Sequence, residues 1–400
     1  MKMNIKKSVI VNNKNTIFLL YFIVVLFTSN PLANDIIFRE LSEFLYYGNL
    51  IFVVLGFYCI LRNEDKEIVL RFALTCLILV TICLINKTSI GALSAFLTLI
   101  LGMKYCCNLD FDDDFLPIIA NAGIVYIIIS VMLCNSYYSN WFSGSRSINP
   151  NTICSLIFVF TVFINLIIGY KCSSKLLFLI NILSVFLIFK YKSRTCLVAI
   201  CIFFALPYII PDRFWQNKRI MVAAIIFAAI GGVLFPLVYI NAPQFLVQFV
   251  TSVTHKDFYS GREQIWTRLF NALKEPKNFI IGPGSWREAE FGRLVFKKKE
   301  SLASMHNSYM SMLLNFGISG IIVYINILCS TISKVYISAQ IDRRVKIALS
   351  GYISFMIIGY GEVLLLHSLT VMLANLMLGM ALYYSRVITL EDEIVELINT

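Results

Sequence analysis

The feature that most constrains this chain is a series of apolar windows of membrane-spanning length. A helix needs about 20 mainly apolar residues to cross about 30 Å of hydrocarbon. Hydrophobic residues make up 58% of the chain and charged residues 14%, whereas soluble domains average about 25% charged residues. The sequence therefore predicts an all-α, polytopic integral membrane protein with about 12 transmembrane helices. The predicted spans lie approximately at 16–33, 41–61, 68–86, 88–104, 115–134, 150–170, 174–189, 195–210, 220–240, 307–331, 347–366 and 369–386.

The placement of Lys and Arg predicts the orientation, because basic residues near the ends of spans resist translocation. With the N-terminus inside, 18 of the 34 Lys and Arg residues fall in cytoplasmic segments and six in short outer loops. Both termini are therefore expected in the cytoplasm. The net charge of +11 partly reflects this bias, and the chain has no nucleic-acid-binding motif.

These spans divide the chain into four parts. Residues 1–240 hold nine spans, residues 241–306 form one long extracytoplasmic loop, residues 307–390 hold spans 10 to 12, and residues 391–400 form a cytoplasmic tail. The loop is polar and basic, and it is far longer than a turn between two helices requires. We therefore expect the chemistry in this loop and the rest of the chain to act as scaffold.

The loop contains one predicted amphipathic helix. Ser260 and Glu263 fit a capping box at its start, and Ile265, Trp266 and Leu269 follow at helical spacing. Further on, Gly282-Pro283-Gly284 predicts a structural turn.

A histidine stands where the loop meets the tenth span. Ser304 is expected to cap that helix, which would place His306 in its first turn. The helix dipole there disfavours an imidazolium, so the ring would stay neutral and able to accept a proton. The alternative is an interfacial histidine that only hydrogen-bonds a neighbouring loop.

Arginines recur at the predicted outer ends of spans and in the loop. Arg146, Arg194 and Arg262 share this side of the membrane, and the planar guanidinium suits forked hydrogen bonds to phosphate. They predict a polyanionic ligand, with anchoring to lipid headgroups as the alternative. Glu362 is predicted inside the eleventh span, where acids are rare and usually functional. It would pair with an outer arginine, contact substrate or bond another helix.

Neither the aspartate cluster near residue 110 nor the cysteines are predicted to form a functional site. The acidic cluster of Asp110 and residues 112–114 falls on the cytoplasmic side, where a solvated turn is favoured over a metal. The 11 cysteines lie in or beside apolar spans and none lies in the long loop, so neither a disulfide framework nor a metal site is predicted.

Taken together, these motifs resemble the superfamily of O-antigen polymerases and O-antigen ligases. The resemblance covers roughly residues 140–330 and depends on the order and spacing of individually weak motifs. The matching pieces are Gly144-Ser145-Arg146 with Asn149-Pro150-Asn151, Ser193-Arg194-Thr195, Ser260-Gly261-Arg262 with Trp266, Ile281-Gly282-Pro283-Gly284, and His306-Asn307-Ser308-Tyr309 with Gly317-Ile318-Ser319-Gly320.

The resemblance implies a glycosyltransferase-C-like membrane enzyme of the bacterial inner membrane that uses no cofactor and no metal. Its donor would be an oligosaccharide linked to undecaprenyl diphosphate, which is the leaving group. Arg194 and Arg262 would bind the diphosphate, with Arg146 a weaker candidate. His306 would be the base, with Glu362 as the second candidate.

The residues that accompany these in the matching motifs would position donor or acceptor: Trp266, Arg287, Asn307 and Tyr309. A polymerase is favoured because the run Asn307-Ser308-Tyr309-Met310 resembles polymerases more than ligases. A ligase that transfers the glycan to lipid A core is the alternative, and a flippase is third because no internal repeat is evident. Membrane lipid, a chain-length regulator and a flippase of the same pathway are the expected partners.

Overall fold

The computed structural model describes residues 20–21, 23–24, 35–109, 115–142, 149–168, 174–254, 258–259, 261–287, 305–335, 342–367 and 370–399. The described residues form helices and their connections, with no strand among them. The helices are α2 (Asp35–Asn63), α3 (Lys66–Asn86), α4 (Ile90–Cys106), α5 (Phe115–Phe142), α6 (Pro150–Ile167), α7 (Ser174–Lys190), α8 (Arg194–Ile209), α9 (Asp212–Trp215), α10 (Lys218–Ile240), α11 (Gln244–Thr254), α12 (Arg262–Ala272), α13 (Pro276–Ile281), α15 (Ser308–Ile332), α16 (Arg343–Ile358) and α17 (Val371–Asn399).

Five described helices are long and apolar enough to cross a membrane: Lys66–Asn86, Pro117–Cys134, Pro150–Ile167, Lys218–Ile240 and Ser308–Ile332. Shorter apolar helices accompany them at Gly48–Asn63, Ile90–Cys106 and Arg194–Ile209. The prediction of a polytopic helical membrane protein agrees with this arrangement. The total of 12 spans stays a prediction, and most of the first span, 16–33, lies outside the described residues.

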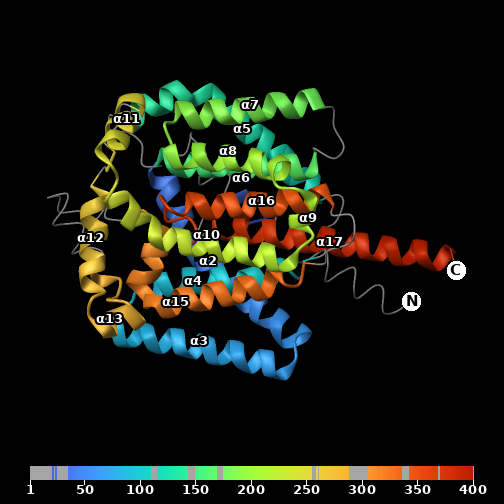
Figure 1. Ribbon diagram of the computed structural model, residues 1–400, viewed down its shortest axis with the longest axis horizontal. Helices are drawn as coiled ribbons and strands as arrows, with labels where there is room; N and C mark the ends of the chain where they lie inside the picture. Colours follow the sequence, from blue (N-terminus) through green and yellow to red (C-terminus); the bar gives the residue numbers. More distant parts are fainter. Residues whose placement is uncertain are drawn as a thin grey trace.

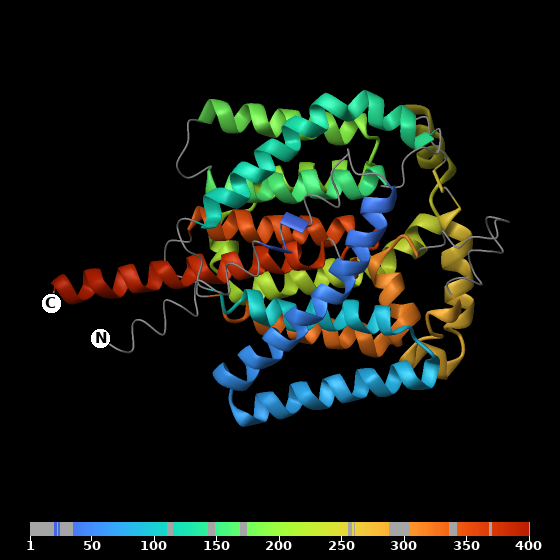
Figure 2. The same cartoon turned by 180° about the vertical axis from the view of Figure 1, so that it is seen from behind.

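The helices that span the bundle lie roughly side by side, and α11, α12 and α13 run across one of its ends (Figure 1). The far part of α17 projects beyond the opposite end, as the reverse view also shows (Figure 2). We call the end that carries α11 to α13 the loop end. The described part of the polar segment that holds α11 to α13 therefore lies across the end of the bundle and is not a simple connector.

The core is built around α6, whose side chains are almost all buried. A helix with apolar side chains on every face is stable only when it is surrounded. Asn149 caps its start by accepting a hydrogen bond from the Asn151 amide at 2.9 Å, and Pro150 occupies the first helical position. In contrast, α3 lies at the edge of the bundle with most of its apolar surface exposed.

The end of α16 corrects the predicted eleventh span. That span was expected to run to residue 366, but α16 ends at Ile358 and a non-helical connection leads to α17. Gly359 and Gly361 weaken a helix at this point. The Gly359 carbonyl accepts a hydrogen bond from the Ser308 amide at 2.8 Å, which ties the connection to the start of α15.

A second departure from a regular span lies within α15, which kinks at Gly317 (φ 61°, ψ −158°). The kink meets the turn after α13, where Gly282 and Gly284 also have positive φ. A Cβ on Gly282 would lie 2.8 Å from the Gly317 nitrogen, and the Gly284 amide donates to the Leu314 carbonyl at 2.8 Å. The two backbones approach each other more closely than side chains would allow.

A polar side chain from α3 completes this junction. The side-chain amide of Asn86 donates to the carbonyls of Ile281 at 2.7 Å and Asn315 at 2.8 Å. The Thr88 hydroxyl donates to the Asn315 carbonyl at 3.0 Å. These bonds satisfy the Ile281 carbonyl at the end of α13 and the Asn315 carbonyl beside the kink, so α13 is fixed to the helical bundle here.

Candidate functional site

Arg194, Arg262, His306 and Glu362 come from four separate segments and meet at the loop end of the bundle. Arg194 is the first residue of α8, and Arg262 is the first residue of α12. His306 precedes α15, and Glu362 follows α16. None of these four residues lies in the middle of a helix. The start or the end of a helix therefore determines where each side chain lies.

Arg262 and Glu362 form a half-buried ion pair. The Arg262 Nη2 atom lies 3.0 Å from the Glu362 Oε1 atom. The same carboxylate oxygen accepts a hydrogen bond from the Asn151 side-chain amide at 2.6 Å. Because two donors converge on it, Glu362 orients the guanidinium. Its predicted place inside a membrane helix is wrong, since α16 has already ended.

Arg194 lies beside this pair. Its Nη2 atom donates to the Phe258 carbonyl at 3.4 Å, and the Tyr239 hydroxyl donates to the same carbonyl. The Phe258 and Tyr239 rings stack with centroids 4.6 Å apart. The segment between α11 and α12 is therefore held against both α8 and α10.

His306 occupies an unusual backbone conformation, with φ at 48°. A non-glycine residue in this region signals a constraint from its surroundings. Burial and, to a smaller extent, the Arg262 charge lower its pKa to about 4. The ring is therefore neutral near pH 7.

The predicted reason for this neutrality is wrong. Asn307 caps α15, with its side-chain oxygen accepting from the Tyr309 amide at 2.7 Å. His306 therefore precedes the cap and does not lie in the first helical turn. Ser304, the predicted cap, lies outside the described residues, as do Ser260 and Arg146. For α12, the residue at the N-cap is Gly261.

Asn307, Tyr309 and Trp266 are buried completely, so in this structure they position the backbone of the site and do not contact a ligand. The Trp266 Nε1 atom donates to the Met305 carbonyl at 2.6 Å. The Tyr309 ring occupies the space beside Gly232. Together they hold the residues on both sides of His306, and their role in positioning donor or acceptor stays a prediction.

Arg287 lies in a different place from the other cations. Its guanidinium stacks over the Trp286 ring at 4.7 Å, and both residues line a separate polar cavity of about 260 Å³ with Lys87 and Glu275. Gly284, in the turn beside it, packs against the Asn86 backbone. The structure therefore does not bring Arg287 into the cavity that Arg194 and Arg262 share.

Arg194, Arg262 and Glu362 line a cavity of about 450 Å³ with two kinds of wall, and His306 is not among the residues that line it. Charged and polar side chains form one part: Asn151, Lys192, Arg194, Thr195, Arg262 and Glu362. Apolar and aromatic side chains form the other: Val198, Phe235, Tyr239, Leu246, Val250, Phe258, Ile357 and Tyr360. An anionic group and an adjoining apolar chain are the ligand chemistry that such walls accommodate.

Lys192 and Asn151 are polar lining residues that were not predicted as site residues. Lys192 has a left-handed backbone conformation (φ 55°) just before α8, and Asn151 lies in the first turn of α6. Asn151 stands within a motif already noted in the sequence and Lys192 directly precedes another, but lysine and asparagine are common at helix ends and carry no signal alone. Among the described residues, no group of three or more His, Cys, Asp and Glu side chains could hold a metal ion.

Residues 176–325 match the family model described as O-antigen ligase. The match begins in α7 and ends in α15, so it includes Arg194, Arg262 and His306 but not Asn151 or Glu362. The resemblance to the superfamily of O-antigen polymerases and ligases is confirmed over this segment. No curated protein and no solved structure matches the chain.

Proposed function

We propose that this protein, which matches the O-antigen ligase family over residues 176–325, is a surface-polysaccharide polymerase. It transfers a glycan from undecaprenyl diphosphate to the acceptor sugar of another lipid-linked repeat unit, at the outer face of the bacterial inner membrane. The observation that carries the proposal is the cavity in which Arg194 and Arg262 face an apolar wall. A lipid diphosphate has this same division between an anionic head and an apolar chain.

The cations act on the leaving group. When the bond between the anomeric carbon and the diphosphate oxygen breaks, negative charge develops on the diphosphate. Arg194, Arg262 and Lys192 line the cavity where that charge would form. Positively charged donors that are already oriented stabilise such charge without rearranging during the reaction.

His306 acts on the acceptor. As the acceptor oxygen bonds to the anomeric carbon, its proton passes to the neutral imidazole. A sugar hydroxyl is a weak acid and gains from a nearby base that is unprotonated near pH 7. Direct displacement of the diphosphate in this way inverts the anomeric configuration.

The second candidate is an O-antigen ligase, which the description of the matching family favours. Polymerase and ligase share the donor, the leaving group and the proton transfer, so the cavity supports both. They differ in the acceptor, which is a lipid-linked repeat for the polymerase and lipid A core for the ligase. The run Asn307-Ser308-Tyr309-Met310 is the sequence feature that favours the polymerase.

Deletion of the gene followed by gel analysis of surface polysaccharide tests the proposal. A polymerase deletion leaves lipid A core bearing one repeat unit. Long chains that remain on undecaprenyl diphosphate would identify a ligase instead, and lipid-linked repeats trapped in the cytoplasm would identify a flippase. Unchanged polysaccharide would contradict all three functions.

A further inference from the structure

A groove lies between α7 and α8, which run alongside each other on one side of the bundle (Figure 1). Two cavities, of about 620 Å³ and about 490 Å³, open between these helices. They share the lining residues Phe178, Asn181, Phe204 and Tyr208, so they are parts of one space, which we call the α7–α8 groove. None of its lining residues lines the cavity that contains Arg194 and Arg262.

Hydrocarbon forms most of the groove's wall. Its apolar lining residues are Leu177, Phe178, Ile182, Val185, Phe186 and Phe189 of α7, Leu197, Phe203, Phe204 and Pro207 of α8, and Ile347 of α16. Asn165 and Asn181 also line it, and each donates a side-chain hydrogen bond to the other, at 2.8 Å and 3.2 Å. Because these two amides are paired with each other, they need no polar ligand.

Cations line the groove only at its end opposite the loop end. Arg343 and Lys346 lie there, in the first turn of α16, whereas no charged residue lines the part nearer the loop end. The exposed Arg343 donates from Nη2 to the Tyr208 hydroxyl at 3.3 Å. Lys346 pairs with Asp212, which does not line the groove. Two cations and one carboxylate leave this end with a net positive charge.

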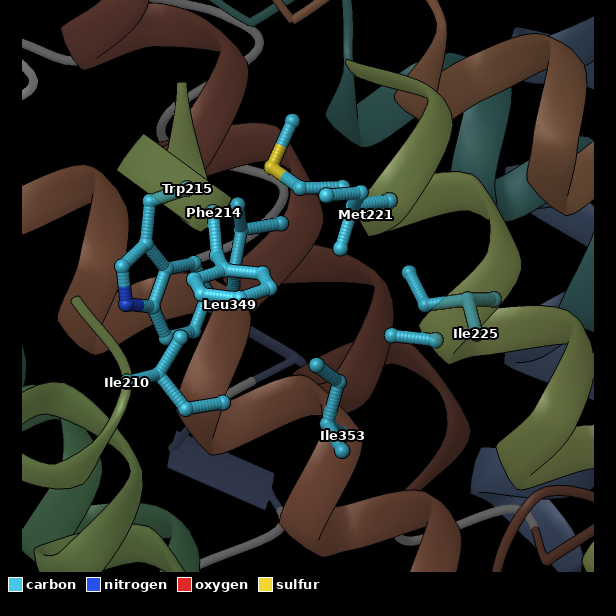
Figure 3. A pocket seen from close by; sticks show the side chains of 9 residues that line it. Ile210, Phe214, Trp215, Met221, Ile225, Leu349 and Ile353 are labelled. Atoms are coloured by element: carbon cyan, nitrogen blue, oxygen red, sulfur yellow. The ribbon is translucent and has the colours of Figure 1, made fainter. Parts of the chain in front are cut away.

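The packing of α9 against α16 fixes the acid that pairs with Lys346. Figure 3 shows Phe214 and Trp215 of α9 around a small apolar pocket that Leu349 of α16 also lines. This packing holds Asp212, the first residue of α9, beside Lys346. No ion pair joins Arg343 to another described residue, so its planar guanidinium remains the group best suited to bind a phosphate.

The length of the groove fits one leaflet of a membrane. Its α7 wall runs from Leu177 to Phe189, which is about 18 Å at 1.5 Å per residue. One leaflet contributes about 15 Å of hydrocarbon, whereas a partner's transmembrane helix needs contact along about 30 Å. The dimensions therefore favour acyl chains. The cations lie at the end away from Arg194 and Arg262, so the groove has the wrong polarity for the proposed donor.

We propose that the α7–α8 groove binds an anionic phospholipid of the leaflet opposite the loop end. Its acyl chains lie between α7 and α8, and its phosphate lies against Arg343 and Lys346. This leaflet is the cytoplasmic one in the predicted orientation, and basic pockets between helices on that side suit anionic headgroups. The lipid joins α7 to α8 and to the start of α16. The inference goes beyond glycan transfer and does not depend on it.

Native mass spectrometry tests the site on the full-length protein, purified in detergent and freed of bound lipid. Phosphatidylglycerol and phosphatidylcholine with the same acyl chains are titrated separately, and the lipids bound to each protein molecule are counted. Arg343→Gln removes one cation from the groove. Its matched control is Arg219→Gln, an exposed arginine in the first turn of α10 at the same end of the bundle, which does not line the groove.

We expect one phosphatidylglycerol to bind the wild-type protein about fivefold or more tightly than phosphatidylcholine. Arg343→Gln should weaken phosphatidylglycerol binding about fivefold and leave phosphatidylcholine binding unchanged. Arg219→Gln should change neither. Equal affinities of the wild-type protein for the two lipids, or an equal loss in both arginine variants, would overturn the inference, because ordinary membrane lipid or diffuse surface charge would then explain the binding.

A steric variant tests the hydrocarbon part of the groove. Ile182→Trp fills the space between the helices, and excluding two CH₂ groups of an acyl chain should weaken phosphatidylglycerol binding about tenfold. The control is Ile78→Trp on α3, since Ile182 is 48% exposed and Ile78 is 54% exposed; it should bind as the wild type does. Wild-type affinity in Ile182→Trp would overturn the inference. If that variant also lost a dimer present in the wild-type spectra, a second copy of the chain would be the occupant.

Discussion

His306 combines a left-handed backbone conformation, a half-buried position and a nearby arginine. If the ring is the base, its removal should lower kcat by about 10² to 10⁴. We expect His306→Ala and His306→Gln to insert normally and to lose polymer formation in a purified assay with lipid-linked repeat units. Wild-type rates in that assay would make the histidine structural.

The pH dependence of the wild-type enzyme gives a separate test of His306. Because burial and Arg262 hold its pKa at about 4, the ring stays neutral at higher pH. The value of kcat/KM should therefore show no loss from His306 protonation between about pH 8 and about pH 5, and should fall below that as the ring is protonated. An acid limb centred near the unperturbed value of about 6.5 would contradict this environment.

The resemblance implied Glu362 as the second candidate base, but from its contacts with Arg262 and Asn151 we expect it to position Arg262. Glu362→Gln keeps an oxygen that can accept from Arg262 and Asn151, whereas Glu362→Ala removes it. We expect the alanine variant to raise the KM for the donor about tenfold, which corresponds to about 1.4 kcal/mol, and the glutamine variant to raise it less. If both variants instead lost kcat equally with an unchanged KM, Glu362 would have a direct part in catalysis.

The identity of the charged residues in the site was predicted from the sequence more accurately than their positions in the fold. Arg194 and Arg262 were recognisable because one lies at the predicted outer end of a span and the other lies in the long loop. Glu362 was placed inside a span, because hydropathy continues past Ile358 and does not register the hydrogen bond from Ser308 that ends α16. Asn307 was not predicted as the cap, because Ser304 fits the same pattern and only the tertiary contacts of Asn307 distinguish them.

At the scale of elements, the junction of α3, α13 and α15 fixes the long loop to the bundle. Gly317→Ala would put a Cβ into the backbone of Ile280 and force an unfavourable positive φ. We expect a loss of about 1–3 kcal/mol, seen as a lower Tm for the purified protein in detergent. Gly48→Ala is the control, since nothing lies within 4 Å of the added atom. An equal Tm for the two variants would show that the junction tolerates a Cβ.

The elements themselves were largely predictable, because long apolar periodicity is the strongest signal in such a chain. The windows at 68–86 and 220–240 fall within α3 and α10. The kink of α15 was not predictable, because Gly317 meets Ile280 and Gly282 only in the folded state. Similarly, α11 and α13 were not predicted, since short helices within a polar loop leave little trace in hydropathy.

For the whole molecule, residues predicted on one side of the membrane gather at one end of the bundle. Lys334 and Lys104 share Glu64 away from the loop end, and Lys346 pairs with Asp212 there. We expect a phosphatase fusion near Lys274 to be active and one near Arg343 to be inactive, as an outer loop end requires. The reverse pattern would place the arginines and His306 in the cytoplasm and remove the proposed donor.

The apolar wall of the candidate cavity includes the exposed side chains of Val198 and Leu246. A donor that enters there remains in the plane of the bilayer throughout its approach. The rate at which donor and enzyme meet then depends on the number of lipid-linked donor molecules per unit of membrane area. The volume of the surrounding compartment has no influence on it. If a cell enlarged its membrane without making more undecaprenyl diphosphate, the donor would be diluted in the plane of the membrane and polymer growth would slow.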